Sequence, residues 1–143
     1  MTWEICKGGW YVMHDDEHPS EWLDMYNKLV EDIMTRKIRF DLTKKLNMHH
    51  IVPRSLAPEL DKPLENHIHL PFRYHMDLHY YLYRHDPQYA VQLWFGCVWG
   101  RKHRQWDLPG GNEEYKQLKE DVTLWATLKK AYKLKAAVET ADK

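Results

Sequence analysis

The positions of the histidines constrain the fold of this chain more than any other feature. Eight of the ten histidines lie between residues 49 and 103, and they include the pair His49-His50 and the pair His75 and His79. Side chains four residues apart share one face of a helix, so His75 and His79 could both reach one metal ion. Neighbours on a strand point to opposite faces, so His49 and His50 should face different parts of a cleft. A β-hairpin packed against a helix would bring these groups into one pocket.

The sequence around these histidines predicts such a hairpin. Residues 47–52 and 67–70 have the composition of two short strands, and the loop between them contains three prolines. His67 and His69 alternate with apolar residues in the second strand. We therefore expect both of these side chains to face away from the core.

Four helices are expected in addition. They cover about residues 20–36, 72–83, 87–99 and 112–138, where apolar residues recur every three to four positions or no helix breaker interrupts the chain. The residues expected to begin or cap these helices are Ser20, Pro71, Asp86 with Pro87, and Asn112. With residues 1–19 as an irregular or short-stranded lead-in, the pattern predicts a single α+β domain over residues 1–143, with its core at 47–83.

The charge balance limits how this chain could bind nucleic acid. Its 21 basic and 21 acidic residues give a formal net charge of +0, which excludes binding by bulk electrostatics alone. The charges are unevenly placed: residues 1–33 hold two basic and eight acidic residues, and residues 34–54 hold six basic and one acidic. Residues 101–143 hold ten basic and seven acidic residues. Any surface for nucleic acid must therefore be local.

The location and redox state of the protein can be inferred from what the sequence lacks. No apolar run approaches the length of a membrane span, and the N-terminus lacks the features of a signal peptide. Cys6 and Cys97 form no paired motif. We expect a soluble intracellular protein with free thiols.

Three segments together resemble the HNH nuclease motif. They are Met48–Leu56 (MHHIVPRSL), Glu65–Leu70 (ENHIHL) and Arg73–Leu82 (RYHMDLHYYL). The order HHxxPR, Asn, HxxxH at this spacing is most similar to the small free-standing, homing-type HNH endonucleases of bacteriophages, over about residues 22–98. The resemblance implies a ββα-metal core surrounded by additional helices, and a phage-encoded protein acting in the cytoplasm of a bacterial host.

The resemblance also implies a role for each residue of the motif. His49 and His79 would be metal ligands with His75 as a third, and His50 would be the general base that activates water. Asn66 would fix the His50 ring through the loop backbone, although in some relatives the equivalent residue contacts the metal. The ion would be one divalent cation, Mg²⁺, Mn²⁺ or Zn²⁺.

This set of groups is suited to phosphodiester hydrolysis. A cation held by few protein ligands keeps open positions for a phosphate oxygen, and a neutral imidazole can take a proton from water near neutral pH. We expect a metal-dependent DNA endonuclease or nickase. The alternative is a non-catalytic nucleic-acid-binding, inhibitor or regulatory protein on the same scaffold. The loop after Leu56 departs from the family pattern, because it reads Ala57–Pro63 without the usual paired glycines.

DNA contacts are expected from basic residues around the motif. The candidates are Arg36, Lys37, Arg39, Lys44, Lys45, Arg54, Arg73, Arg101, Lys102 and Arg104. For Arg36, Lys37 and Arg39 the alternative is a structural role at the C-terminus of the first helix, where basic residues suit the helix dipole. The acidic first 33 residues should face away from DNA or contact a protein partner, including a second copy of the chain.

Overall fold

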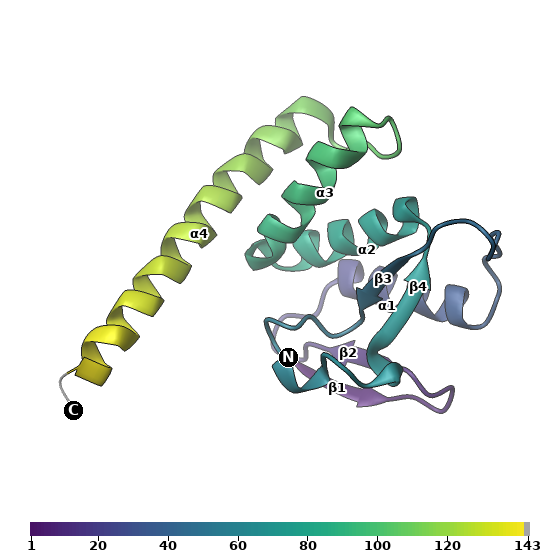
Figure 1. Ribbon diagram of the computed structural model, residues 1–143, viewed down its shortest axis with the longest axis horizontal. Helices are drawn as coiled ribbons and strands as arrows, with labels where there is room; N and C mark the ends of the chain where they lie inside the picture. The colour runs from purple at the N-terminus through teal and green to yellow at the C-terminus, as the bar shows by residue number, and fades with distance from the viewer. Residues whose placement is uncertain (142–143) are drawn as a thin grey trace. The chain divides into compact units, whose positions relative to one another are not determined.

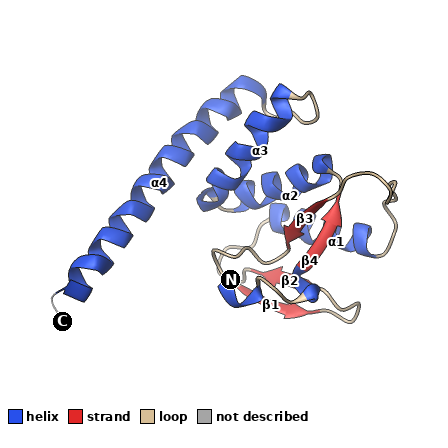
Figure 2. Ribbon diagram, viewed as in Figure 1, coloured by secondary structure: helices blue, strands red, loops and turns tan. Residues whose placement is uncertain are grey.

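The chain folds into an α+β structure with two small antiparallel sheets and four α-helices in its described part (Figure 2). The computed structural model describes the backbone of residues 1–141 and the side chains of residues 1–130. It consists of two compact units, Met1–His85 and Asp86–Lys143. The motif core expected at 47–83 lies in the first unit, and the single nuclease domain over 1–143 stays a prediction.

The lead-in is a β-hairpin. Strand β1 (Thr2–Ile5) pairs antiparallel with β2 (Tyr11–His14), with Trp3 opposite Met13. Gly9 in the connecting turn has a φ of +97°, a conformation that favours glycine, and its N–H donates to the Cys6 carbonyl at 3.0 Å. Met13 is fully buried, so the hairpin contributes to the core of the first unit.

The first helix, α1 (Glu21–Met34), begins where the sequence predicts. The Ser20 side chain caps it by accepting a hydrogen bond from the Leu23 N–H at 3.3 Å. The helix ends early, at Met34, and Arg36 beyond it adopts a left-handed conformation with φ 64°. The buried side chains of α1 recur every three to four residues, as an amphipathic helix requires: Leu23, Tyr26, Val30 and Ile33.

The second hairpin and the helix after it confirm the predicted strand-loop-strand-helix order. Strands β3 (Asn47–His50) and β4 (His67–Leu70) lie side by side and pair antiparallel (Figure 1). In this pairing His49 is opposite Ile68. Two short 3-10 helices, η1 (Pro58–Leu60) and η2 (Leu64–Asn66), lie in the loop between them. Helix α2 (Phe72–His85) follows directly, packs against α1 and also contacts β3.

The second unit begins with a cap. The Asp86 carboxylate accepts a hydrogen bond from the Gln88 N–H at 3.1 Å and starts a 3-10 turn, η3 (Pro87–Tyr89), that leads into α3 (Ala90–Lys102). The last helix, α4 (Gly111–Ala141), packs against α3. The prediction that Asn112 caps this helix was wrong. The helix begins one residue earlier, and the Asn112 side chain instead accepts a hydrogen bond from Arg101.

Two further expectations concern cysteines and membranes. Cys6 and Cys97 are both free thiols. None of the described helices has the length and apolar character that a membrane span requires.

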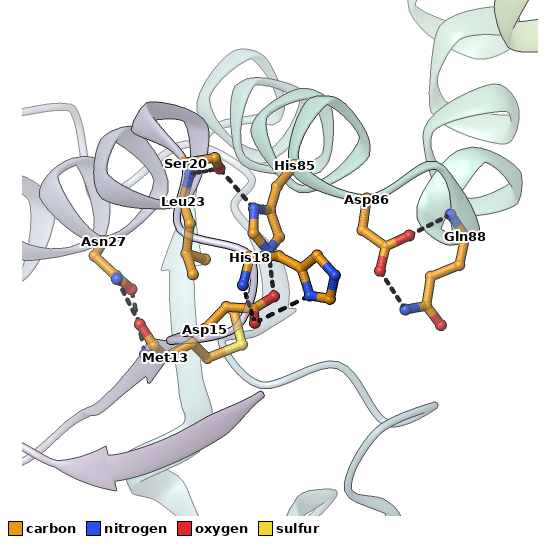
Figure 3. Close-up of polar contacts among 9 residues, drawn as sticks. All are labelled: Met13, Asp15, His18, Ser20, Leu23, Asn27, His85, Asp86 and Gln88. Carbon is orange, nitrogen blue, oxygen red and sulfur yellow. Dashed lines mark hydrogen bonds and ion pairs between the residues drawn. The ribbon is translucent and has the colours of Figure 1, made fainter.

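A buried histidine connects three segments of the first unit (Figure 3). The His85 side chain, at the end of α2, is only 1% exposed. Its Nε2 donates to the Asp15 carboxylate at 2.9 Å, and its Nδ1 lies 2.6 Å from the Ser20 hydroxyl that caps α1. Burial would raise the pKa of Asp15, but hydrogen bonds from the His85 ring and the His18 backbone outweigh burial and lower it. His85 thus joins the loop after β2, the start of α1 and the end of α2.

Replacing His85 should destabilise the first unit. His85→Ala leaves the Asp15 carboxylate without its main donor and opens a cavity, so we expect a loss of about 2–3 kcal/mol in the free energy of unfolding. His18 is the matched control, because its ring lies 3.8 Å from the same carboxylate but its side chain is 80% exposed. His18→Ala should change stability by less than about 0.5 kcal/mol. Urea unfolding followed by tryptophan fluorescence measures both, and equal losses would contradict the role of His85.

Candidate metal centre

Three histidines converge at the junction of β3 and α2. The ligand atoms of His49, His75 and His79 all lie within 4.8 Å of one another, close enough to hold one metal ion. His75 and His79 share a face of α2, with their Nε2 atoms 3.0 Å apart. The ring of His49 reaches them from β3, with its centroid 5.1 Å from that of His75 and 4.9 Å from that of His79. The grouping expected from the spacing of the histidines is thus present.

A tyrosine from α1 fixes the orientation of His49. The Tyr26 hydroxyl donates to the Ile51 carbonyl at 2.7 Å, so its proton is already used. Its oxygen also lies 2.7 Å from His49 Nε2, which must therefore carry a proton and donate it. In the neutral ring this leaves the lone pair on Nδ1, which is the atom available to a metal.

An asparagine orients His75 in the same way. The His75 Nδ1 lies 3.0 Å from the side-chain oxygen of Asn47, the first residue of β3. An amide oxygen only accepts, so Nδ1 donates and the lone pair of the neutral ring is on Nε2, facing His79. Partners of this kind hold metal-binding imidazoles in one tautomer.

The surroundings keep all three rings uncharged. Burial lowers the pKa of His49 well below its usual value, and the nearby His79 and His75 lower it further. Burial likewise lowers the pKa of His79 to about 3 and that of His75 to about 4. Only the neutral imidazole can bind a metal, so the rings are ready to act as ligands at neutral pH.

His50 faces away from this group, as expected for the second residue of the pair. Its Nε2 lies 3.0 Å from the Asp61 carbonyl oxygen and 2.9 Å from the Asp61 carboxylate. Its ring packs edge-on against that of His67. Strand alternation therefore separates His49, in the candidate metal centre, from His50, which contacts the loop between the strands.

Asn66 holds that loop together. The residue is fully buried, and its side chain accepts a hydrogen bond from the Val52 N–H at 2.7 Å. Its amide group donates to the carbonyls of Val52 and Leu60, each at 3.0 Å. These three contacts join the start of the loop to the residue before Asp61. All three of these side-chain contacts of Asn66 are thus with the loop backbone.

All ten basic residues expected to contact DNA are exposed. Seven lie in the first unit and three, Arg101, Lys102 and Arg104, in the second. Arg54 lies 3.7 Å from the Asp61 carboxylate, and the guanidinium of Arg73 rests on the Tyr74 ring. At the end of α1, the backbone N–H of Arg36 donates to the Ile33 carbonyl at 3.2 Å, and the last turn of the helix holds no basic residue. The Arg36 side chain is exposed and available for other contacts.

Four residues at the site were not anticipated from the sequence. Tyr26 orients His49 and Asn47 orients His75. Asp61 contacts the His50 ring, and His67 contacts the Asp61 carbonyl. Tyr26 lies on the periodic apolar face of α1, a pattern typical of core residues. His67 was expected to be exposed, but it is half-buried because the loop around Asp61 folds over it.

Comparisons with protein-family models, curated proteins and solved structures found no match to this chain. Its function must therefore be inferred from the site itself.

The lowered pKa values predict a particular dependence of stability on pH in the metal-free protein. The unfolded chain takes up protons on these histidines below about pH 6.5, whereas the folded protein keeps the rings neutral to much lower pH. Above pH 6.5 the rings are neutral in both states, so the folded protein keeps its full free energy of unfolding. As the pH falls toward 5, this free energy decreases, and each ring accounts for a decrease of up to about 1.4 kcal/mol per pH unit.

Unfolding in urea with EDTA between pH 7.5 and about 5 measures this slope. His79→Asn should reduce the slope by about one proton's contribution, and the exposed His69→Asn should leave it unchanged. A stability that does not change over this range would contradict the assignment of buried neutral rings.

Proposed function

We propose that this protein is a divalent-metal-dependent endonuclease or nickase of the HNH type that hydrolyses phosphodiester bonds of DNA. The observation that carries the proposal is that the adjacent residues His49 and His50 place their side chains in different surroundings. One ring joins a group of three neutral imidazoles, and its neighbour stands apart with one nitrogen fixed by a carbonyl. Strand β3 supplies the His49-His50 pair and α2 supplies His75 and His79, and the chain order β3, β4, α2 is compatible with a ββα-metal core.

The donor set suits a transition-metal ion. Imidazole nitrogen is a good ligand for ions such as Zn²⁺, whereas Mg²⁺ prefers oxygen. His49, His75 and His79 would hold the ion, and three protein ligands leave coordination positions open. When bound, the ion would act as a Lewis acid that stabilises charge on the phosphate and on the leaving oxygen.

In this proposal His50 moves the proton. Its Nε2 faces a backbone carbonyl, which can only accept, so Nε2 carries the proton of the neutral ring and Nδ1 carries the lone pair. Nδ1 would take a proton from a water molecule as the water oxygen attacks phosphorus. The bond from phosphorus to the leaving oxygen then breaks, and the leaving oxygen takes a proton from solvent. Asn66 would keep the loop carbonyl in place for His50.

Removing the His50 imidazole should abolish most cleavage. With a supercoiled plasmid and Zn²⁺, Mn²⁺ or Mg²⁺, we expect His50→Ala to cut about 10²–10⁴-fold more slowly than wild type. His69→Ala is the control, since His69 is an exposed histidine of the neighbouring strand. His69→Ala should cut at the wild-type rate, and EDTA should stop cleavage by wild type and by His69→Ala.

Two results would contradict this proposal in different ways. A His50→Ala protein with full activity would remove His50 as the base. A wild-type protein that binds DNA and metal but cuts neither strand with any of the three ions would favour the non-catalytic alternative.

The basic residues predict how binding responds to salt. If Arg36, Lys37 and Arg39 contact phosphates, replacing all three with Ala should reduce the slope of log K against log salt by about two to three units on duplex DNA. Lys62→Ala, at another exposed lysine, is the control and should leave the slope unchanged. An unchanged slope with a lower melting temperature in the triple variant would assign these residues to the end of α1.

A further inference from the structure

Asp61, in the loop between β3 and β4, contacts His50, Arg54 and His67. Its carboxylate oxygen Oδ1 lies 2.9 Å from His50 Nε2 and 3.7 Å from the Arg54 guanidinium. Its carbonyl oxygen lies 3.0 Å from His50 Nε2 and 2.6 Å from His67 Nε2. Neither the motif nor the spacing of the histidines pointed to this residue.

The two histidines that contact Asp61 form a cross-strand pair. His50 ends β3 and lies opposite His67, the first residue of β4. Their ring centroids are 5.2 Å apart and the rings are almost perpendicular, at 87°. A carbonyl oxygen has two lone pairs, so it can accept from both rings, and both must then carry a proton on Nε2. His67 thereby holds the Asp61 carbonyl and also packs against the His50 ring.

We propose that Asp61 and His67 are positioning residues for His50. Asp61 accepts from Nε2 through its carboxylate as well as its carbonyl, which keeps the His50 lone pair on Nδ1. His67 restrains both the carbonyl and the His50 ring. What the oriented ring then does rests on the proposed nuclease function.

The Asp61 carboxylate is poorly explained by stability alone. The side chain is 45% exposed, so it fills no space in the core. A negative charge near a site for phosphate would repel the substrate, and Arg54, at 3.7 Å, is placed to offset that charge. A carboxylate behind an imidazole also stabilises the positive charge that the ring acquires when it takes a proton, as in serine protease triads.

The test separates orientation from activity. Nitrogen-15 NMR of the histidine rings in the metal-free protein, at a pH where imidazoles are neutral, reports the tautomer of His50 directly. We expect the Nε2–H form in wild type and in Asp61→Asn, whose side-chain oxygen can still accept. Asp61→Ala keeps the backbone carbonyl but loses the carboxylate acceptor, so it should show a larger share of the Nδ1–H form than wild type. Glu59→Ala, at an exposed acidic residue of the same loop, should match wild type.

Plasmid nicking supplies the second readout. Asp61→Ala should lower kcat by about 10–100-fold with KM unchanged, as for other groups that orient a reacting imidazole. Asp61→Asn should restore part of this loss. His67→Phe, which keeps a ring but loses the donor, should lower kcat, and His67→Gln, whose amide can donate, should recover activity.

An Asp61→Ala protein with the wild-type tautomer and the kcat of Glu59→Ala would overturn the proposal. So would a wild-type protein in which His50 carries its proton on Nδ1. If the wild-type protein cuts no DNA, the tautomers still decide whether Asp61 orients His50, and only the proposed function fails.

Discussion

Three imidazole rings, buried at His49 and half-buried at His75 and His79, lie together, and every nitrogen removed from water needs a partner. Tyr26 and Asn47 satisfy one nitrogen of His49 and one of His75, and the Nε2 atoms of His75 and His79 share a hydrogen bond at 3.0 Å. This requirement ties α1 to the hairpin, because the tyrosine that orients His49 comes from the buried face of that helix. The geometry of the candidate metal centre therefore depends on how α1, β3 and α2 pack together.

The loop between β3 and β4 depends on a second buried polar group. Asn66 makes three hydrogen bonds to the backbone of this loop. Asp61 follows directly after one of the carbonyls that Asn66 holds. A loop without paired glycines can thus still present a carbonyl and a carboxylate to His50.

The sequence predicts the parts that depend on local pattern. Strand alternation separates His49 from His50, the helical period joins His75 to His79, and Ser20 caps α1 as expected. The partners of these rings depend on tertiary packing, which no spacing encodes. Tyr26 looks like any core residue of an amphipathic helix, and His67 looks exposed because strand alternation does not show that the loop before it folds back over its ring. Asn112 was misassigned because α4 already begins at Gly111, so Asn112 lies inside the helix and its side chain accepts from Arg101.

The central claim is that His49 belongs to the candidate metal centre and the adjacent His50 does not. Calorimetric titration of Zn²⁺ into matched variants tests this claim most directly. His50→Ala should bind one ion per chain with wild-type affinity, because the His50 side chain lies against the loop and His67, away from the three candidate ligands. His49→Ala should lose most of that affinity, because it removes one of three ligands. Equal affinities in the two variants, whether both are retained or both are lost, would contradict the claim.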